Sequence, residues 1–444
     1  MKQKSVFGIY IGLLAGWLSL TGTVATTAAV LNDTDAHARG CRLGGVMGIN
    51  RLLPSWVSVA ADDTPQTAEG IVTRSAVTHQ DMPTYHTSHD WNFDVKLDKA
   101  FHGLYSEVTR QHAAMEMEWE INFFPPEYWP VAGDRVWMMG RWIFDCGHPP
   151  YRTELHPVKA VAFTRSEPMI LAGDKAPSLT NKTLIYLHGR GGYYNAPIAD
   201  RNYEFDIHLP AKPSAGAELH TQALETPFGG PEPVLTPMPE ANKVHVLYPL
   251  ALSDPNPERK FAAVVAAGWR EPVLTRGYRQ LKVTIEKLKI NLDHDPRAAG
   301  SWRFFARAGS HWMEVPGLDE VNNGFVKPIN QSFVVTVPEN GALSLQTTGW
   351  EDDCDGAFSS INAVIRQGAK PTDLAPKALQ CQTDDNDRIG YLNLRYTAAE
   401  NFGIGSHNEP SVRNAAGEAD TAADFNLSYR IEELHRYRPG TPVR

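Results

Sequence analysis

Four residues that can bind metals or move protons lie in one short stretch, GRWIFDCGHPPYRTELHP (140–157). They are Asp145, His148, Glu154 and His156. If the residues after the turn form a strand, Glu154 and His156 project from one face, because strand side chains alternate between faces. A turn at Gly147 could then fold Asp145 and His148 back toward them. The stretch is therefore our first candidate for a functional site.

These residue types allow three interpretations. Two imidazoles and two carboxylates suit Zn²⁺ or another borderline divalent ion, with a metal-bound water as nucleophile. They would equally suit general acid–base catalysis, for which His148, Glu154 and His156 are the candidates. The third interpretation is structural: Glu154 and His156 form a hydrogen-bonded pair, and Asp145 caps the turn. The residues alone leave all three open.

A second group of candidates lies upstream, in HTSHDWNFD (86–94). His89 and Asp90 directly precede or begin an alternation of polar and apolar residues that predicts a half-buried strand. If this strand neighbours residues 136–145, both side chains would approach the first stretch. We therefore add His89 and Asp90 to the candidate metal ligands.

Composition limits the classes of function. The chain has 444 residues, of which 42% are hydrophobic and 21% are charged, and such values are typical of globular proteins. The net charge is −9, and no cluster of Lys and Arg longer than a pair occurs. A nucleic-acid-binding protein would normally present a basic face, so we exclude that class.

The first 38 residues are typical of an export signal. Lys2 and Lys4 precede an apolar stretch, residues 6–20, and small residues follow. Cleavage could follow Ala25, Ala29 or Ala38, and we expect a mature terminus near Arg39. Residues 39–79 would form a leader, and the protein would be periplasmic or secreted.

Export favours disulfide formation among the four cysteines. Closeness in sequence predicts a Cys354–Cys381 bridge. Cys146 would then pair with Cys41 or stay free.

Short strands separated by Pro and Gly turns predict a mostly β protein. We expect a small antiparallel barrel over 80–165, a β-rich extension or insertion over 166–275, and a β-sandwich over 276–444. LIYLHGRGGYYN (184–195) is similar to the oxyanion loop of α/β-hydrolases. The chain has no G-x-S-x-G nucleophile elbow and lacks the helices of that fold, so we exclude it.

The segment GDRVWMMGRWIFDCGH, with the TELHP that follows, resembles a barrel module of exported bacterial proteins, of the oligonucleotide/oligosaccharide-barrel type. The shared features are a glycine–acid turn, a G-x-W-x-x-D strand and an E-[IL]-H-P ending. The resemblance implies a barrel and includes Glu154, His156 and Pro157 in its pattern. It implies no reaction.

Two acidic loops mark the predicted sandwich. Their candidate ligands are Asp353, Asp355, Asp385 and Asp387. Clustered carboxylates suit Ca²⁺, which takes six to eight oxygen ligands. With DDNDRIGYLNLRY (384–396), this part is similar to the calcium-binding sandwiches of protein kinase C and synaptotagmin, and the resemblance implies Ca²⁺ and docking on a membrane surface. The alternative is that these loops are ordinary solvated turns.

Three functions therefore remain open for this exported protein. The first is a metal-dependent hydrolase with its site at 140–157. The second is a non-catalytic protein that binds an extracellular glycan, lipid or protein. The third is a structural surface component stabilised by calcium.

Overall fold

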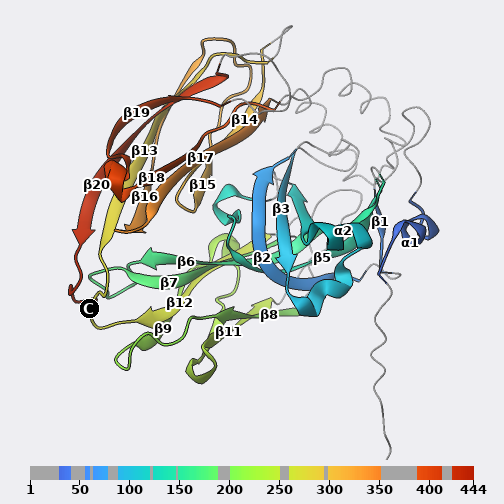
Figure 1. The fold of residues 1–444 in the computed structure, drawn as a ribbon, viewed down its shortest axis with the longest axis horizontal. Helices are drawn as coiled ribbons and strands as arrows, with labels where there is room; N and C mark the ends of the chain where they lie inside the picture. The colour runs from blue at the N-terminus through green and yellow to red at the C-terminus, as the bar shows by residue number, and fades with distance from the viewer. Residues whose placement is uncertain are drawn as a thin grey trace, which may run out of the picture.

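The structure is a computed structural model that describes residues 30–41, 56–60, 64–78, 89–120, 124–146, 149–188, 201–250, 260–294, 299–351, 388–412 and 423–444. Over these residues the chain is mostly β, as the sequence predicts (Figure 1). A barrel comes first, a pair of central sheets follows, and a sandwich ends the chain. The helices are short: α1 (Asp33–Ala38), α2 (Glu107–His112), and the 3-10 turns η2 (Lys99–Leu104), η3 (Pro126–Tyr128), η4 (Pro227–Gly229), η5 (Pro239–Ala241) and η7 (Ala398–Gly403).

The first six strands build the barrel region: β1 (Trp56–Ser58), β2 (Gln66–Val77), β3 (Asp90–Leu97), β4 (Met115–Glu120), β5 (Arg135–Asp145) and β6 (Arg152–Met169). The strands β2, β3, β4, β6 and β5 pair in that order, and β5 pairs back to β2, which closes a ring. All of these pairings are antiparallel except β4 with β6, which is parallel. The predicted small barrel is therefore present, and its pairings are antiparallel apart from that of β4 with β6.

Alternation along the strands fills the barrel. Trp91 and Phe93 from β3, Met117 and Trp119 from β4, and Leu155 from β6 are all buried in one hydrophobic core. The polar residues between them face the outside, because successive strand side chains point to opposite faces. The polar positions of the sequence pattern are thus gathered on the outer face of the barrel.

Gly140 sets the register between β5 and β6. The pairing of these strands shifts on both sides of Gly140. A Cβ at this position would lie 2.9 Å from the carbonyl oxygen of Pro157, a distance that real Cβ atoms essentially never show. Glycine therefore permits the close approach, and beyond the shift Ile143 lies opposite Glu154.

Residues 30–41 pack against the barrel. Asn32 caps α1, because its side chain accepts hydrogen bonds from backbone N–H groups of the first turn. The carboxylate of Asp33 accepts a hydrogen bond from the backbone N–H of Tyr151 at 2.9 Å. These contacts make the segment part of the folded molecule.

A disulfide joins Cys41 to Cys146. This is one of the two outcomes that the sequence leaves open for Cys146. A disulfide indicates a non-cytoplasmic, oxidising compartment. Cys354 and Cys381, the other predicted pair, lie outside the described residues.

The central region contains β7 (Ser178–His188), β8 (Arg201–His208), β9 (Glu218–Glu225), β10 (Val234–Met238), β11 (Lys243–Leu250) and β12 (Lys260–Arg270). The long strand β6 runs out of the barrel and pairs with β7, and the sheet continues through β12 to β9. The sheet β10-β11-β8 packs on it through a second core that includes Phe205, Val246 and Ala263. The side chains of β9 and β10 are mostly half-buried or exposed, so the sequence shows no clear alternation in these two strands.

The last strands form the predicted sandwich: β13 (Tyr278–Ile290), β14 (Trp302–Ala308), β15 (His311–Glu314), β16 (Val326–Pro338), β17 (Ala342–Glu351), β18 (Asn393–Thr397), β19 (Gly405–Pro410) and β20 (Phe425–Tyr437). In the described part of the chain they make two sheets, β16-β13-β20-β19 and β15-β14-β17-β18. Their inner faces share a third hydrophobic core.

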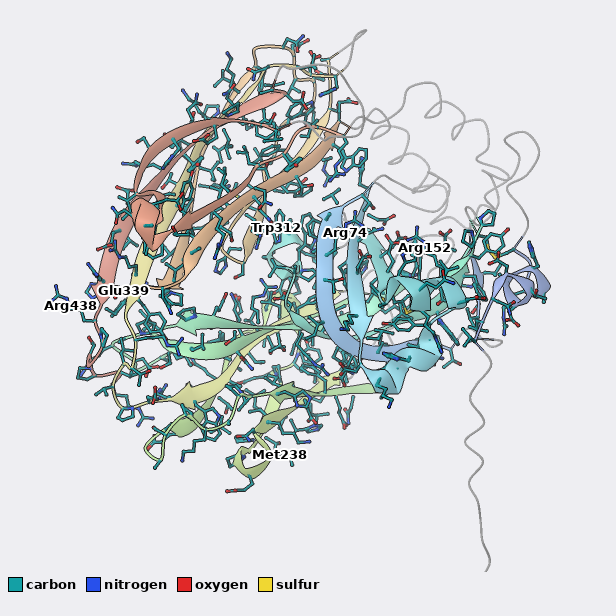
Figure 2. The ribbon with its side chains drawn as sticks, viewed as in Figure 1. Arg74, Arg152, Met238, Trp312, Glu339 and Arg438 are labelled. Atoms are coloured by element: carbon teal, nitrogen blue, oxygen red, sulfur yellow. A yellow bond between two sulfur atoms is a disulfide. The ribbon has the colours of Figure 1, made fainter. Side chains whose placement is uncertain are left out.

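Aromatic side chains join the barrel to the sandwich. Trp91 and Trp129 stack with ring centroids 3.7 Å apart. In the sandwich, the Phe305 ring lies 4.6 Å from that of Trp129, and the Trp312 ring lies 5.1 Å from that of Trp91, both measured between centroids. Trp312 is labelled in Figure 2. Beside this cluster, the buried Arg165 guanidinium lies 2.7 Å from the Asp134 carboxylate and donates to the backbone carbonyl of Ser310. No helix among the described residues has the length and apolar character needed to cross a membrane.

Candidate metal centre

The parallel pairing of β4 with β6 brings together residues that are far apart in sequence. In its register Glu116 lies opposite Glu154. On the other side of β4, Asn92 of β3 lies opposite Glu118. Strand parity puts Glu118 on the same face as Glu116, and His156 on the same face as Glu154. A polar stripe therefore crosses three strands on the outer face of the barrel.

Glu118, Glu154 and His156 converge within this stripe. The His156 Nδ1 atom lies 2.6 Å from a carboxylate oxygen of Glu118. One ligand atom from each of the three residues lies within 4.8 Å of the other two. Glu154 and His156 are buried, whereas the side chain of Glu118 is 14% exposed. We call these three residues the triad.

Two neighbouring side chains hold the acids of the stripe. Asn92 Nδ2 donates to Glu116 at 2.6 Å and also to Glu118. The Arg152 guanidinium (Figure 2) pairs with Glu116, and its Nε lies 3.5 Å from Glu154 and 3.6 Å from Asp145. Such contacts to ligands fix their orientation, as outer-shell partners do in known metal sites.

Negative charge is in excess around Glu154. Burial raises the pKa of Glu154 well above its usual range, and the carboxylates of Glu118, Asp145 and Glu116 raise it further, while Arg152 lowers it. Burial also raises the pKa of Asp94, with Glu116 adding to the effect. Arg152 thus lies near three acids, of which Glu154 is buried, and a bound cation would relieve the repulsion among them.

The predicted site residues lie in different places in the structure. It brings Glu154 and His156 together on one face, as strand parity predicts. Asp145 lies 3.6 Å from the Nε atom of Arg152, opposite which it lies in the β5–β6 register. His148 lies outside the described residues.

His89 and Asp90 do not belong to the triad. The strand that Asp90 begins, β3, pairs with β2 and β4, so the expected adjacency to residues 136–145 is wrong. The ring of His89 packs against Trp350 of the sandwich, with centroids 5.3 Å apart. When the barrel closes, β2 lies between β3 and β5. The local sequence pattern of a strand does not encode this order.

The candidate ligands in the acidic loops of the sandwich, Asp353, Asp355, Asp385 and Asp387, all lie outside the described residues. Calcium binding there, and docking on a membrane surface through the sandwich, stay predictions.

Glu118 is the triad residue that the sequence analysis does not single out. Met115–Ile121 (MEMEWEI) predicts a strand with its glutamates on the polar face, and the structure has that strand as β4. The available signal was a run of glutamates at every second position. Nothing in that run indicates which strand pairs with β4.

Two cavities occur near other parts of the described chain. A cleft of 600 Å³ lies between the barrel and the sandwich and includes Asp134, Arg165 and His311 in its lining. A pocket of 240 Å³ lies at the end of the central sheets. Neither of them contains a triad residue.

Comparisons with known proteins do not assign this chain to a family. No protein-family model matches the chain, and no curated protein matches it. Among solved structures, human GIVD cytosolic phospholipase A2 is similar over 37% of this chain and 17% of its own, with 11% identity and a TM-score of 0.22. A chain of several domains from extended-synaptotagmin 2 is similar over 90% of this chain and 93% of its own, with 8% identity and a TM-score of 0.22. The chain spans less than a fifth of the phospholipase. Likeness at these TM-scores transfers neither fold nor activity.

Proposed function

We propose that the protein binds a divalent metal ion through Glu118, Glu154 and His156 and uses the bound ion to hydrolyse a substrate. The observation that carries this proposal is the convergence of three ligand-type atoms within 4.8 Å of one another, two of them on buried side chains. Buried carboxylates are costly without a compensating charge. A divalent cation would supply that charge.

The ligand set indicates which ions fit. One imidazole and two carboxylates favour Zn²⁺ or a similar borderline divalent ion over ions that prefer only oxygen ligands. Catalytic zinc sites commonly have three protein ligands and keep a fourth position for water. Glu118 is the most exposed member of the triad, so that position would lie on its side.

The chemistry would be that of an activated water. A bound zinc ion lowers the pKa of its water to about 7, so hydroxide is available near neutral pH. Asn92 would keep the Glu118 carboxylate in place, and Arg152 would do the same for Glu154. His148, a predicted acid–base residue, stays a candidate for proton transfer.

One observation favours a second function, in which the metal is structural and the protein only binds an extracellular partner. Glu154 and His156 are almost fully buried. Catalytic sites are usually concave and open to their substrate. A metal ion bound at these buried residues would stabilise the fold and would not take part in catalysis.

Metal analysis combined with two chromogenic probes would separate these functions. The full chain is depleted with EDTA, reloaded with Zn²⁺, and assayed with p-nitrophenyl acetate and bis-p-nitrophenyl phosphate. The hydrolase proposal expects one bound ion per chain and an activity that EDTA removes and Zn²⁺ restores. His156→Ala should lose both, while the exposed His112→Ala should keep both.

The other outcomes are equally informative. A bound ion without activity toward either probe would favour the structural metal. A wild-type protein that binds no Zn²⁺ would refute the site itself.

A further inference from the structure

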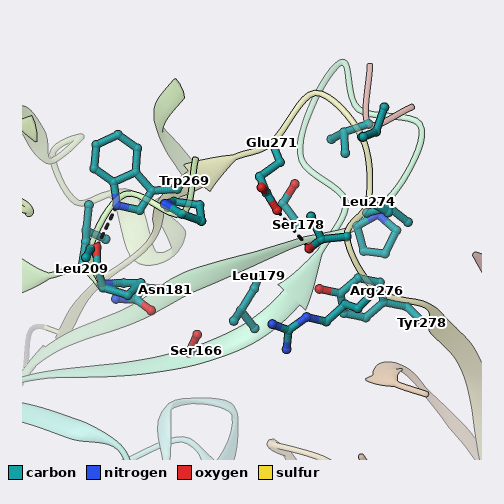
Figure 3. Close-up of a pocket in the computed structure, with 18 residues that line it drawn as sticks. Ser166, Ser178, Leu179, Asn181, Leu209, Trp269, Glu271, Leu274, Arg276 and Tyr278 are labelled. Carbon is teal, nitrogen blue, oxygen red and sulfur yellow. Dashed lines mark hydrogen bonds between the residues drawn. The ribbon is translucent and has the colours of Figure 1, made fainter. Parts of the chain in front are cut away.

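A pocket of 240 Å³ lies where the chain passes from the central sheets into the sandwich (Figure 3). Its walls come from the first residues of β7, the last residues of β12, the segment 209–213 and the connection 271–278. Apolar side chains dominate the lining, among them Leu179, Leu209, Trp269, Leu274 and Tyr278. This pocket contains no triad residue and is separate from the candidate metal site.

Backbone hydrogen bonds hold the walls of the pocket in place. The Leu274 N–H donates to the Thr441 carbonyl at 2.9 Å, and the Val443 N–H donates to the Pro272 carbonyl at 3.1 Å. The C-terminal residues thereby fix the connection between the central sheets and the sandwich. The Trp269 indole N–H donates to the Pro210 carbonyl at 2.9 Å, which fixes the orientation of its ring. The cavity is therefore preformed and would need little ordering to bind a ligand.

Two features of the lining indicate a missing partner. Leu179 is 40% exposed although it lies beside other apolar side chains. Ser178 is only 8% exposed, and its buried Oγ has no hydrogen-bond partner among the described residues. Buried hydroxyl groups are nearly always hydrogen-bonded, so an unpaired one in a cavity wall points to a ligand or a water.

The charged residues of the pocket lining are one arginine, Arg276, and one glutamate, Glu271. Arg276 is exposed, and within the described part of the chain it has no ion pair. Figure 3 shows its side chain extending toward Leu179. Lys212 lies over the Trp269 ring, with Nζ 5.7 Å from the centroid. Lys212 does not line the pocket, whereas Glu271 does, and Glu271 accepts a hydrogen bond from Thr275 at 3.0 Å.

We propose that this pocket binds a small carboxylic acid with an aromatic or branched apolar body. The apolar body lies against Trp269 and Leu179, the carboxylate pairs with Arg276, and Ser178 gains a hydrogen-bond partner. The size fits, because a dry cavity of about 150 Å³ can hold benzene, and 240 Å³ adds room for a short acidic substituent. A neutral ligand of the same shape would leave Arg276 without its partner.

Calorimetric titration of the full chain with phenylacetate and with its neutral analogue phenylacetamide tests the proposal. Both titrations are done in EDTA, so that the metal site has no part in the result. We expect phenylacetate to bind about fivefold more tightly, the effect of one exposed ion pair. Arg276→Gln should bring the two affinities together, whereas Arg110→Gln on α2 should leave the ratio unchanged.

A second variant tests the location. Leu179→Trp fills the cavity and should abolish binding of both compounds while leaving the unfolding curve cooperative. The proposal is overturned if phenylacetate does not bind at millimolar concentration, if the two compounds bind equally to the wild type, or if Leu179→Trp binds as the wild type does.

Discussion

Replacing Glu154 by Gln should have opposite effects on stability with and without metal. Without metal, the Glu154 carboxylate is buried and repelled by neighbouring acids. Two unit charges 4.8 Å apart, the largest separation in the triad, interact by about 3 kcal/mol at an effective dielectric constant of 20. Attraction by Arg152 offsets part of this, but solvent screens it because the Arg152 side chain is 38% exposed. We therefore expect Glu154→Gln to raise the free energy of unfolding in EDTA by about 1–2 kcal/mol at pH 8.

The pH dependence gives the sign independently. The pKa of Glu154 is higher in the folded protein than the value of about 4.3 expected in the unfolded chain. The folded protein therefore binds the proton more tightly, and its stability falls as the pH rises through the folded pKa. Glu154→Gln should flatten this fall, so the gain should be small at pH 4 and larger at pH 8.

Metal should reverse the order of the two proteins. Zn²⁺ at a hundredfold excess over its Kd would stabilise the wild type by about 2.7 kcal/mol, while the variant has lost a ligand and gains less. Urea unfolding at pH 4, 7 and 8, in EDTA and in Zn²⁺, measures all of these differences. The exposed Glu240→Gln is the matched control and should change neither curve. A variant less stable than the wild type in EDTA at pH 8 would refute the reasoning.

Four further predictions follow from other parts of the molecule. Replacing Cys41 and Cys146 together by Ser should lower the free energy of unfolding by about 4 kcal/mol, because the bridge spans 105 residues; an unchanged denaturation midpoint would contradict this. Arg165→Ala should destabilise the fold by about 3–5 kcal/mol, since it leaves Asp134 buried and unpaired. Burial raises the pKa of Asp134 to about 6, so this loss should be larger at pH 8 than at pH 5, and equal losses would argue against that titration. If the export signal is cleaved, N-terminal sequencing should find the mature terminus after Ala25 or Ala29 and not near Arg39, where the sequence alone places it, because cleavage after Ala38 would remove α1 and its contact with Tyr151. Millimolar Ca²⁺ should raise the Tm of chelated protein and Asp385→Ala should abolish the rise; no shift in the wild type would leave the acidic loops as solvated turns.

The sequence identified individual strands well, because the signal for a strand is local. Alternation at a period of two gives β3, β4 and most of the sandwich strands, and the same parity puts Glu154 and His156 on one face. Glycine and proline mark the turns between these strands. The sequence does not identify β9 and β10, because their side chains are largely exposed or half-buried. Polar and apolar residues therefore do not alternate clearly along these two strands.

Pairing between strands is not local, and it determines the composition of the candidate site. The pattern of β4 is the same whichever strand lies beside it. Only closure of the barrel puts β4 parallel to β6, which brings Glu118 to within 2.6 Å of His156, and the same closure inserts β2 between β3 and β5. Residue types and periodicity thus predict two of the three proposed ligands. The third, Glu118, depends on which strands pair when the barrel closes around its core. Every strand contributes to that core, so no single segment of the sequence encodes the pairing.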